Sequence, residues 1–205
     1  MIVMISNQYS FRAGFLAGTY PDRIAHLHTP DSWREPAIRF GLDNGVYGAW
    51  SAKREWNEPR WRATIERAVQ YLPMWAVVPD WVGDKELTLK KWDIYSPYVK
   101  SLGLRCAIAA QNGMTPSDIP KDADVLFIGG TEDWKWNSLK MWTDNFPRVH
   151  IGRVNTYKLL MRCHEAGAES CDGTGWFRDP RRILGLERYL NETSEIRTHQ
   201  PELDL

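Results

Sequence analysis

The chain has 205 residues, a length that favours a single domain over residues 1–205 with a full hydrophobic core. Its 26 basic and 26 acidic residues give a net charge of zero, which excludes a strongly basic nucleic-acid-binding surface over the whole chain but not a local basic patch. No apolar run approaches the ~20 residues that cross a membrane, and the first residues lack the charged segment of a signal peptide, so we expect neither feature.

In the first part of the chain, strands alternate with loops and one clear helix. Residues 2–6 form the first predicted strand. Residues 7–36 are rich in proline and turn residues, and we expect a loop-rich insertion or lid there. A second strand over 37–42, a helix over 59–72 with proline in its first turn, and an apolar strand over 74–78 follow.

The rest of the chain continues the alternation. A helix over 85–102 is stopped by Gly103. Further strands are predicted over residues 105–110, 125–128, 149–152 and 168–171. The intervening and final helices are a short one with Asn137 as candidate N-cap, one from Thr156 to Glu165, and one over 180–190. Residues 191–205 are expected to form a loosely ordered tail.

Repeated strand-then-helix units of ~30 residues are typical of parallel strands joined by right-handed crossovers. About seven or eight such units predict a closed (β/α)8 barrel of the TIM type, and since that fold usually takes ~250 residues, we expect a compact or trimmed barrel. An open doubly wound parallel sheet is the alternative.

Polar or glycine-rich residues stand at the ends of several predicted strands. They are Asp43-Asn44-Gly45, Pro79-Asp80, Gln111-Asn112-Gly113, Gly129-Gly130, Arg153 and Asp172-Gly173. The carboxyl ends of barrel strands meet at one mouth, so the sequence predicts a single pocket lined by this set. Carboxylates can accept hydrogen bonds from the N–H groups of a purine-like ring, and an amide or glycine N–H can donate to its carbonyl oxygen. A remaining aspartate is then free to act as nucleophile or general base.

The three cysteines, Cys106, Cys163 and Cys171, form no pair or cluster with the spacing of a zinc site. We therefore expect reduced cysteines, no metal and no cofactor, in a cytoplasmic protein.

The motifs occur in a family-like order: Asp-x-Gly-x-aromatic, Pro-Asp, Gln-x-Gly, Ile-Gly-Gly and Ala-Gly-x-x-x-x-Asp, over residues 40–177. This order resembles the tRNA-guanine transglycosylase superfamily, and especially its branch in bacteria and phages that inserts 7-deazaguanine bases into DNA. The resemblance implies a TIM-like barrel and a pentosyltransferase that exchanges guanine in a polynucleotide for a 7-deazaguanine base. For a viral protein the location would be the host cytoplasm.

The resemblance also implies roles for individual residues. Asp172 matches the nucleophile that forms a covalent glycosyl-enzyme intermediate, and Asp43 matches the second catalytic aspartate, a general acid/base. The residues that match base-binding positions are Tyr47, Asp80, Gln111, Gly129 and Gly130. The neighbouring basic residues Arg153 and Arg178 are candidates for contacts with phosphate or substrate.

One departure from the family bears on the substrate. The tRNA enzymes carry a Cys-x-Cys-x-x-Cys…His zinc site after the nucleophile, and the 33 residues that follow Asp172 contain no cysteine. This difference favours DNA over tRNA, with a smaller nucleoside-like substrate also open. A protein partner or a homo-oligomer could supply further contacts with the nucleic acid.

Two other functions remain open from the sequence. One is a hydrolase of the same fold that splits a purine or deazapurine nucleoside with water, and the other is a barrel that binds nucleic acid or protein without catalysis. Each motif also has a structural interpretation, since Asp43-Asn44-Gly45 is an ordinary turn signal and Asp172 before glycine can cap a turn. His150 is interpreted as a packing or surface residue.

Overall fold

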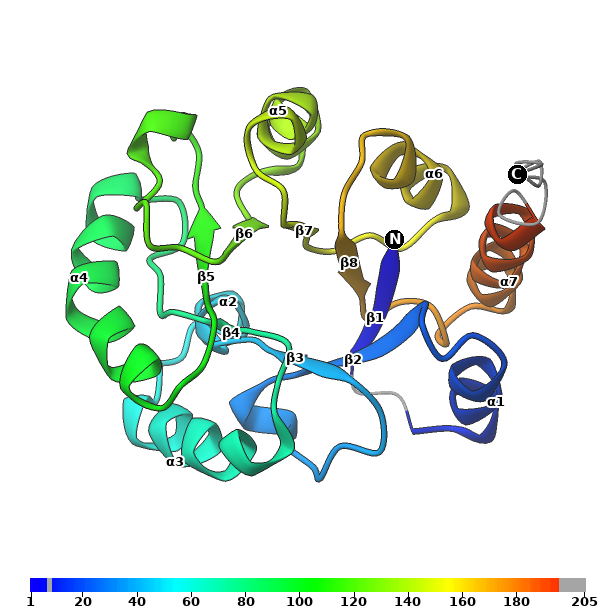
Figure 1. The fold of residues 1–205 in the computed structure, drawn as a ribbon, viewed down its shortest axis with the longest axis horizontal. Helices are drawn as coiled ribbons and strands as arrows, with labels where there is room; N and C mark the ends of the chain where they lie inside the picture. The colour runs from blue at the N-terminus through cyan, green and yellow to red at the C-terminus, as the bar shows by residue number, and fades with distance from the viewer. Residues whose placement is uncertain (7–8, 196–205) are drawn as a thin grey trace, which may run out of the picture.

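The computed structural model describes residues 1–6 and 9–195 as one closed barrel of parallel strands. The strands pair in chain order from β1 to β8, and β8 pairs with β1 to close the ring. Figure 1 shows helices around the outside of this ring, while α2 projects onto the strands rather than beyond them. The predicted TIM-like barrel is confirmed, and the open sheet is excluded because the strands pair in one closed ring with no free edge strand among them.

The strands are short and are each followed by a helix or a helical turn. Their bounds are β1 (Ile2–Ser6), β2 (Ile24–His28), β3 (Phe40–Leu42), β4 (Ala76–Val77), β5 (Cys106–Ala110), β6 (Val125–Ile128), β7 (Val149–Ile151) and β8 (Ser170–Gly173). The α-helices are α1 (Phe11–Thr19), α2 (Val46–Ser51), α3 (Glu58–Ala68), α4 (Lys85–Ser101), α5 (Glu132–Asn145), α6 (Tyr157–Glu165) and α7 (Pro180–Glu195). Single 3₁₀ turns are η1 (Pro30–Ser32), η2 (Val69–Tyr71) and η3 (Pro116–Asp118).

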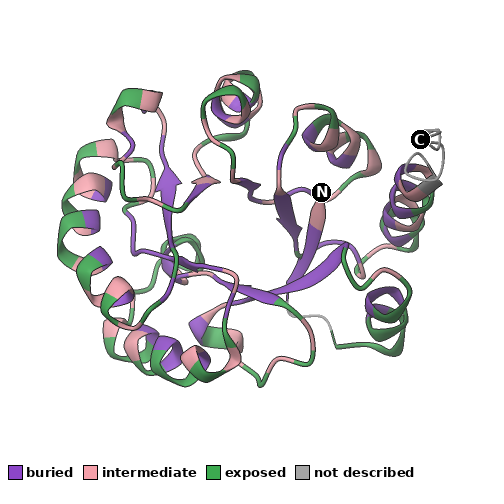
Figure 2. Ribbon diagram, viewed as in Figure 1, coloured by how far each residue is buried: buried purple, intermediate pink, exposed green. Residues whose placement is uncertain are grey.

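Apolar side chains form two cores because successive strand residues face opposite sides of the barrel wall. The larger core lies between the strands and the helices, and it includes the fully buried Trp61 and Trp142 of α3 and α5. The smaller core consists of strand and strand-flanking residues such as Met4, Leu27 and Trp75, and it fills the barrel interior. Figure 2 shows the result, with buried strands and with helices exposed on their outer faces.

The segment 7–36 is not the loop-rich insertion that was expected. Within its described part, Ser10 caps α1 by accepting a hydrogen bond from the Ala13 N–H, and β2 follows as a barrel strand. The strand is hidden in the sequence because its residues Ile-Ala-His-Leu-His contain two histidines, which break the apolar pattern. Both histidines are buried in the fold against aromatic rings, so tertiary packing overrides their polarity.

Several predicted boundaries also need correction. Helix α5 begins after Thr131, so Asn137 lies inside the helix instead of capping it. Helix α7 continues to Glu195, which makes the first five residues of the expected tail helical; residues 196–205 lie outside the described residues. The short helix α2 has no predicted counterpart, since its sequence Val-Tyr-Gly-Ala-Trp-Ser has only six residues and lacks a clear helical stripe. Among the described helices, none has the length and apolar character needed to cross a bilayer.

Candidate active site at the carboxyl end of the barrel

Three aspartates from separate strand ends share the mouth of the barrel. Asp43 follows β3, Asp80 follows β4 and Asp172 lies within β8. The negative charges of Asp172 and Asp80 both act on Asp43 and raise its pKa, so the three carboxylates lie within electrostatic reach of one another. The structure therefore brings together the three carboxylates that the sequence placed at strand ends.

Asp172 is buried at the end of β8, with 6 % of its surface exposed. Its Oδ1 atom lies 3.2 Å from His150 Nε2 and accepts a hydrogen bond from the Arg153 backbone N–H at 3.3 Å. Its backbone carbonyl accepts a hydrogen bond from the Val154 N–H at 2.6 Å. Among the described residues, none donates a hydrogen bond to Oδ2. One oxygen of this carboxylate is therefore held by donors, and we call the other oxygen open because it receives no hydrogen bond from them.

Asp43 has a different electrostatic environment. Burial, followed by the charges of Asp172 and Asp80, raises the pKa of its carboxyl from an ordinary value near 3.8 to about 7. Hydrogen bonds from the backbone of Gly45 and Asn44 act in the opposite direction and are outweighed. A carboxyl with a pKa near neutrality can both donate and accept a proton, as a general acid/base must.

Asp80 is held by two amide side chains. Asn44 Nδ2 donates to its Oδ1 at 2.9 Å, and Gln111 Nε2 donates to its Oδ2 at 2.8 Å. Gln111 is positioned in turn because its Oε1 accepts a hydrogen bond from the Gly83 N–H at 2.9 Å. Burial raises the pKa of the Asp80 carboxyl, and the two amides oppose that rise. The result is a rigid carboxylate–amide pair that links the ends of β4 and β5.

Gly129 and Gly130 bring bare backbone close to the same network. A Cβ atom on Gly129 would lie 3.2 Å from the Ala110 carbonyl oxygen, and one on Gly130 would lie 2.6 Å from both Asn112 Oδ1 and the Trp134 ring. Gly130 also has a φ of +70°, a left-handed conformation that favours glycine. The backbone geometry and close contacts of Gly130 therefore require a residue without a side chain, and the contact at Gly129 leaves little room for one.

Arg153 spans the mouth from the end of β7. Its Nη2 donates to the Gly130 carbonyl oxygen at 2.6 Å, and its Nη1 donates to the Tyr47 hydroxyl at 3.1 Å. The guanidinium also lies over the Tyr47 ring at 4.8 Å, in a cation–π contact. Because Arg153 has a φ of +64°, its backbone N–H can reach Asp172 while its side chain points across the mouth. Tyr47 and Arg153 thus form one side of the entrance.

Arg178 does not join this group. Its side chain is exposed, and its backbone N–H donates to the Gly175 carbonyl oxygen at 3.2 Å. Within the described residues, no hydrogen bond or ion pair connects its guanidinium to the mouth aspartates.

Several residues of the site were not identified from the sequence. His150 was interpreted as packing or surface, yet it lies under Asp172 in the barrel interior. Lys135 is fully buried, and its Nζ donates to the Gly152 carbonyl oxygen at 2.9 Å, which braces the strand end before Arg153. The signal for His150 was available, because His150, Ser170 and Asp172 occupy inward positions of neighbouring strands.

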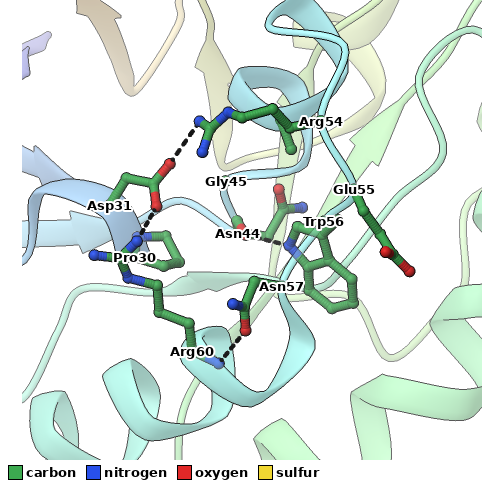
Figure 3. A pocket seen from close by; sticks show the side chains of 10 residues that line it. Pro30, Asp31, Asn44, Gly45, Arg54, Glu55, Trp56, Asn57 and Arg60 are labelled. Carbon is green, nitrogen blue, oxygen red and sulfur yellow. Dashed lines mark hydrogen bonds and ion pairs between the residues drawn. The ribbon is translucent and has the colours of Figure 1, made fainter.

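A separate cavity of about 140 Å³ opens beside the mouth. Figure 3 shows Arg54 and Arg60 both paired with Asp31 there, at 3.1 and 2.7 Å. Its lining shares Asn44 and Gly45 with the turn after Asp43 but includes none of the three mouth aspartates. The Trp56 indole N–H donates to the Asn44 carbonyl oxygen at 2.9 Å, so this region supports the residue that holds Asp80.

Over the described residues, no group of three or more His, Cys, Asp or Glu side chains has the geometry to hold a metal ion. Neither protein-family models nor curated proteins give a match to this chain. The function must therefore be argued from the chemistry of the mouth.

Proposed function

We propose that the protein is a base-exchange transglycosylase, which replaces guanine in a polynucleotide with a 7-deazaguanine base. The observation that carries the proposal is the unequal environment of three aspartates in one mouth. Asp172 has an open oxygen, Asp43 has a pKa of about 7, and Asp80 is held between two amides. These environments suit a nucleophile, a general acid/base and a base-reading group, in that order.

In the first step, the Asp172 carboxylate attacks C1′ of the sugar and the C1′–N9 bond breaks. Guanine leaves with the electron pair of that bond, and the protonated Asp43 carboxyl supplies the proton that the leaving base needs. A covalent aspartyl-glycosyl intermediate results, which divides one difficult displacement into two easier ones.

In the second step, the incoming base transfers its N9 proton to Asp43 and attacks C1′. The ester bond to Asp172 breaks, and its electron pair returns to the carboxylate. Asp43 ends the cycle protonated, as it began. Since one glycosidic bond replaces another, the exchange requires no ATP.

The groups that we propose to read the base are Asp80, Gln111, Gly129 and Gly130, which follow β4, β5 and β6. Asp80 keeps lone pairs beyond those used by Asn44 and Gln111, and these can accept hydrogen bonds from the ring N–H and amine of a guanine-like base. Gln111 Nε2 has a second N–H, and the backbone of Gly129 and Gly130 is nearby, so donors are available for the carbonyl edge.

A polynucleotide substrate is supported by exposed aromatic rings that follow two of these strand ends. Tyr47, Trp50 and Trp81 are 42 %, 58 % and 50 % exposed, and Arg153 adds a cation at the entrance. Aromatic rings beside cations are typical surfaces for stacking unpaired bases. We propose DNA in preference to tRNA because the zinc-bearing element of the tRNA enzymes has no counterpart among the cysteines of this chain.

A release assay tests the proposal. DNA and tRNA carrying labelled guanine, and labelled guanosine and deoxyguanosine, are incubated with the protein, with and without a 7-deazaguanine base. We expect release of label from DNA only when the base is added, with the base recovered in the polymer. Release in water alone would instead identify a nucleoside or polynucleotide hydrolase. Binding of nucleic acid without release from any substrate would contradict catalysis.

A further inference from the structure

A polar chain runs through the largely apolar interior of the barrel. Ser170 Oγ lies 2.8 Å from His150 Nδ1, and His150 Nε2 lies 3.2 Å from Asp172 Oδ1. His150 and Ser170 have no exposed surface. The imidazole is enclosed by the rings of Trp75 and Phe127, whose centroids lie 4.9 and 4.6 Å from its own.

Burial of this chain is unfavourable unless its polar atoms are satisfied. A hydroxyl or an imidazole that moves from water into an apolar interior without hydrogen-bond partners carries a free-energy penalty. Inward positions on other strands carry apolar residues such as Met4, Leu27 and Val77. The polar chain is therefore a specific feature of the wall beneath Asp172, and it ends on that carboxylate.

The direction of the hydrogen bonds follows from the ends of the chain. A Ser170 hydroxyl that donates to His150 Nδ1 uses the one acceptor that the described residues offer it. The imidazole proton then lies on Nε2, which donates to Asp172 Oδ1. In the opposite tautomer, Nε2 carries no proton, and a nitrogen lone pair would face a carboxylate oxygen at 3.2 Å with no hydrogen between them.

The backbone completes the restraint on the carboxylate. The Arg153 N–H donates to the same oxygen, Oδ1, and the Val154 N–H holds the Asp172 carbonyl. Gly152 lies alongside, where a Cβ atom would come 3.5 Å from Oδ1. Two donors on Oδ1 and none from the described residues on Oδ2 set the rotation of the carboxylate.

We propose that His150 and Ser170 are positioning residues that hold Oδ1 of Asp172 and make Oδ2 the atom that attacks the sugar. This inference rests on the proposed transglycosylase function. In the attack, the Oδ2–C1′ bond forms while the C1′–N9 bond breaks, and Oδ1 becomes the carbonyl oxygen of the ester. The donors on Oδ1 then polarise that carbonyl, which helps the ester oxygen leave when the incoming base attacks.

Kinetics of three variants test the positioning role. His150→Phe removes the donor and keeps an aromatic ring, and we expect kcat to fall about 100-fold while KM for DNA and for the base changes less than about 2-fold. His150→Gln keeps an N–H donor and should recover about 10-fold of that loss. Ser170→Ala frees the imidazole to change tautomer and should lower kcat about 10-fold.

Met4→Leu is the matched control. Met4 is fully buried in the barrel interior and is the register partner of Asp172 on β1. No hydrogen bond joins their side chains within the described residues. A change of similar volume there should leave kcat within about 2-fold of the wild type. Folded His150→Phe protein with wild-type kcat would overturn the positioning role, as would equal losses in Met4→Leu and Ser170→Ala.

A second measurement does not depend on turnover. NMR spectra of protein labelled with ¹⁵N-histidine should assign the proton of neutral His150 to Nε2 in the wild type, and a mixture of tautomers in Ser170→Ala. A proton on Nδ1 in the wild type would overturn the inference even if the enzyme is active. If the wild type releases no base but shows the Nε2–H tautomer, the proposed reaction fails while the restraint on Oδ1 stands.

Discussion

The two sides of the barrel mouth use the same residue type in opposite ways. On the β4–β5 side, both oxygens of Asp80 accept hydrogen bonds from amides, so this carboxylate is fixed before any ligand arrives. On the β7–β8 side, the Asp172 carboxylate receives its side-chain and backbone hydrogen bonds on one oxygen. Under the proposed function, the surroundings of an aspartate, and not its presence at a strand end, make the Asp80 side the recognition side and the Asp172 side the reactive side.

Asp43 stands between these two sides and responds to both. Its pKa is raised first by burial and then by the charges of Asp172 and Asp80. A ligand that neutralises either neighbour would lower this pKa, because it removes a repulsive charge. The three carboxylates are therefore coupled, because the pKa of Asp43 depends on the charges of Asp80 and Asp172.

The largest expected effect is on the reactive side. Asp172→Asn keeps the shape of the side chain and removes the nucleophilic oxygen, so we expect turnover to fall at least ~1000-fold and the trapped covalent adduct to disappear. Asp133→Asn, at an exposed position of α5, is the charge-matched control and should retain full activity. Retained turnover in Asp172→Asn would show that Asp172 is not the nucleophile, and the proposed difference between the Asp80 side and the Asp172 side would then fail.

The next effect concerns proton transfer. Asp43→Asn should reduce kcat about 100- to 1000-fold, in the lower part of the range for loss of a general acid/base. In the wild type, kcat/KM should fall as the pH rises through about 7, because Asp43 loses the proton that the leaving guanine needs. That alkaline decline should be absent from the residual activity of Asp43→Asn, and its persistence would assign the decline to another group.

The raised pKa of Asp43 also predicts a pH-dependent stability. The carboxyl ionises near pH 4 in the unfolded chain and at about 7 in the folded protein, so the folded state binds the extra proton between these values and loses stability as the pH rises. Asp43→Asn should therefore stabilise the protein above pH 7, by no more than about 4 kcal/mol, and have little effect below about pH 4. Denaturant unfolding at several pH values measures the difference, and a gain that is the same at every pH would contradict it.

On the recognition side, the expected effects are smaller and of another kind. Asp80→Ala leaves the amides of Asn44 and Gln111 without their acceptor, and we expect a loss of about 1–3 kcal/mol in unfolding free energy. Preference for guanine over adenine should fall at least about 10-fold, measured by competition between the two bases. Unchanged discrimination in folded protein would show that Asp80 serves only to join β4 and β5.

The smallest effect is expected at the entrance. Arg153→Lys keeps the charge but loses the planar fork that reaches both Tyr47 and the Gly130 carbonyl. We expect KM to rise about 3- to 10-fold with little change in kcat, because the backbone N–H that holds Asp172 is retained. A fall in kcat with KM unchanged would place the guanidinium among the groups that act on the reacting atoms.

Much of the fold could be predicted because most strands are local features of the sequence. The apolar runs before Asp80, Gln111 and Gly129 indicate buried strands, and the polar residues after them mark strand ends. β2 was missed for an equally physical reason. In the sequence, His26 and His28 resemble exposed polar residues. They become buried only in the folded protein, where Tyr9, Trp33 and Phe40 pack around them.

The sequence by itself determined that Asp43, Asp80 and Asp172 stand at strand ends, since that depends only on which residues follow each apolar run. The tertiary structure alone decided their partners. The His150–Asp172 and Arg153–Tyr47 contacts join residues 22 and 106 positions apart, and they arise only when parallel strands pair and the barrel closes. Local patterns can place a carboxylate, but its pKa and its open oxygen depend on burial and on neighbours that the closed barrel supplies.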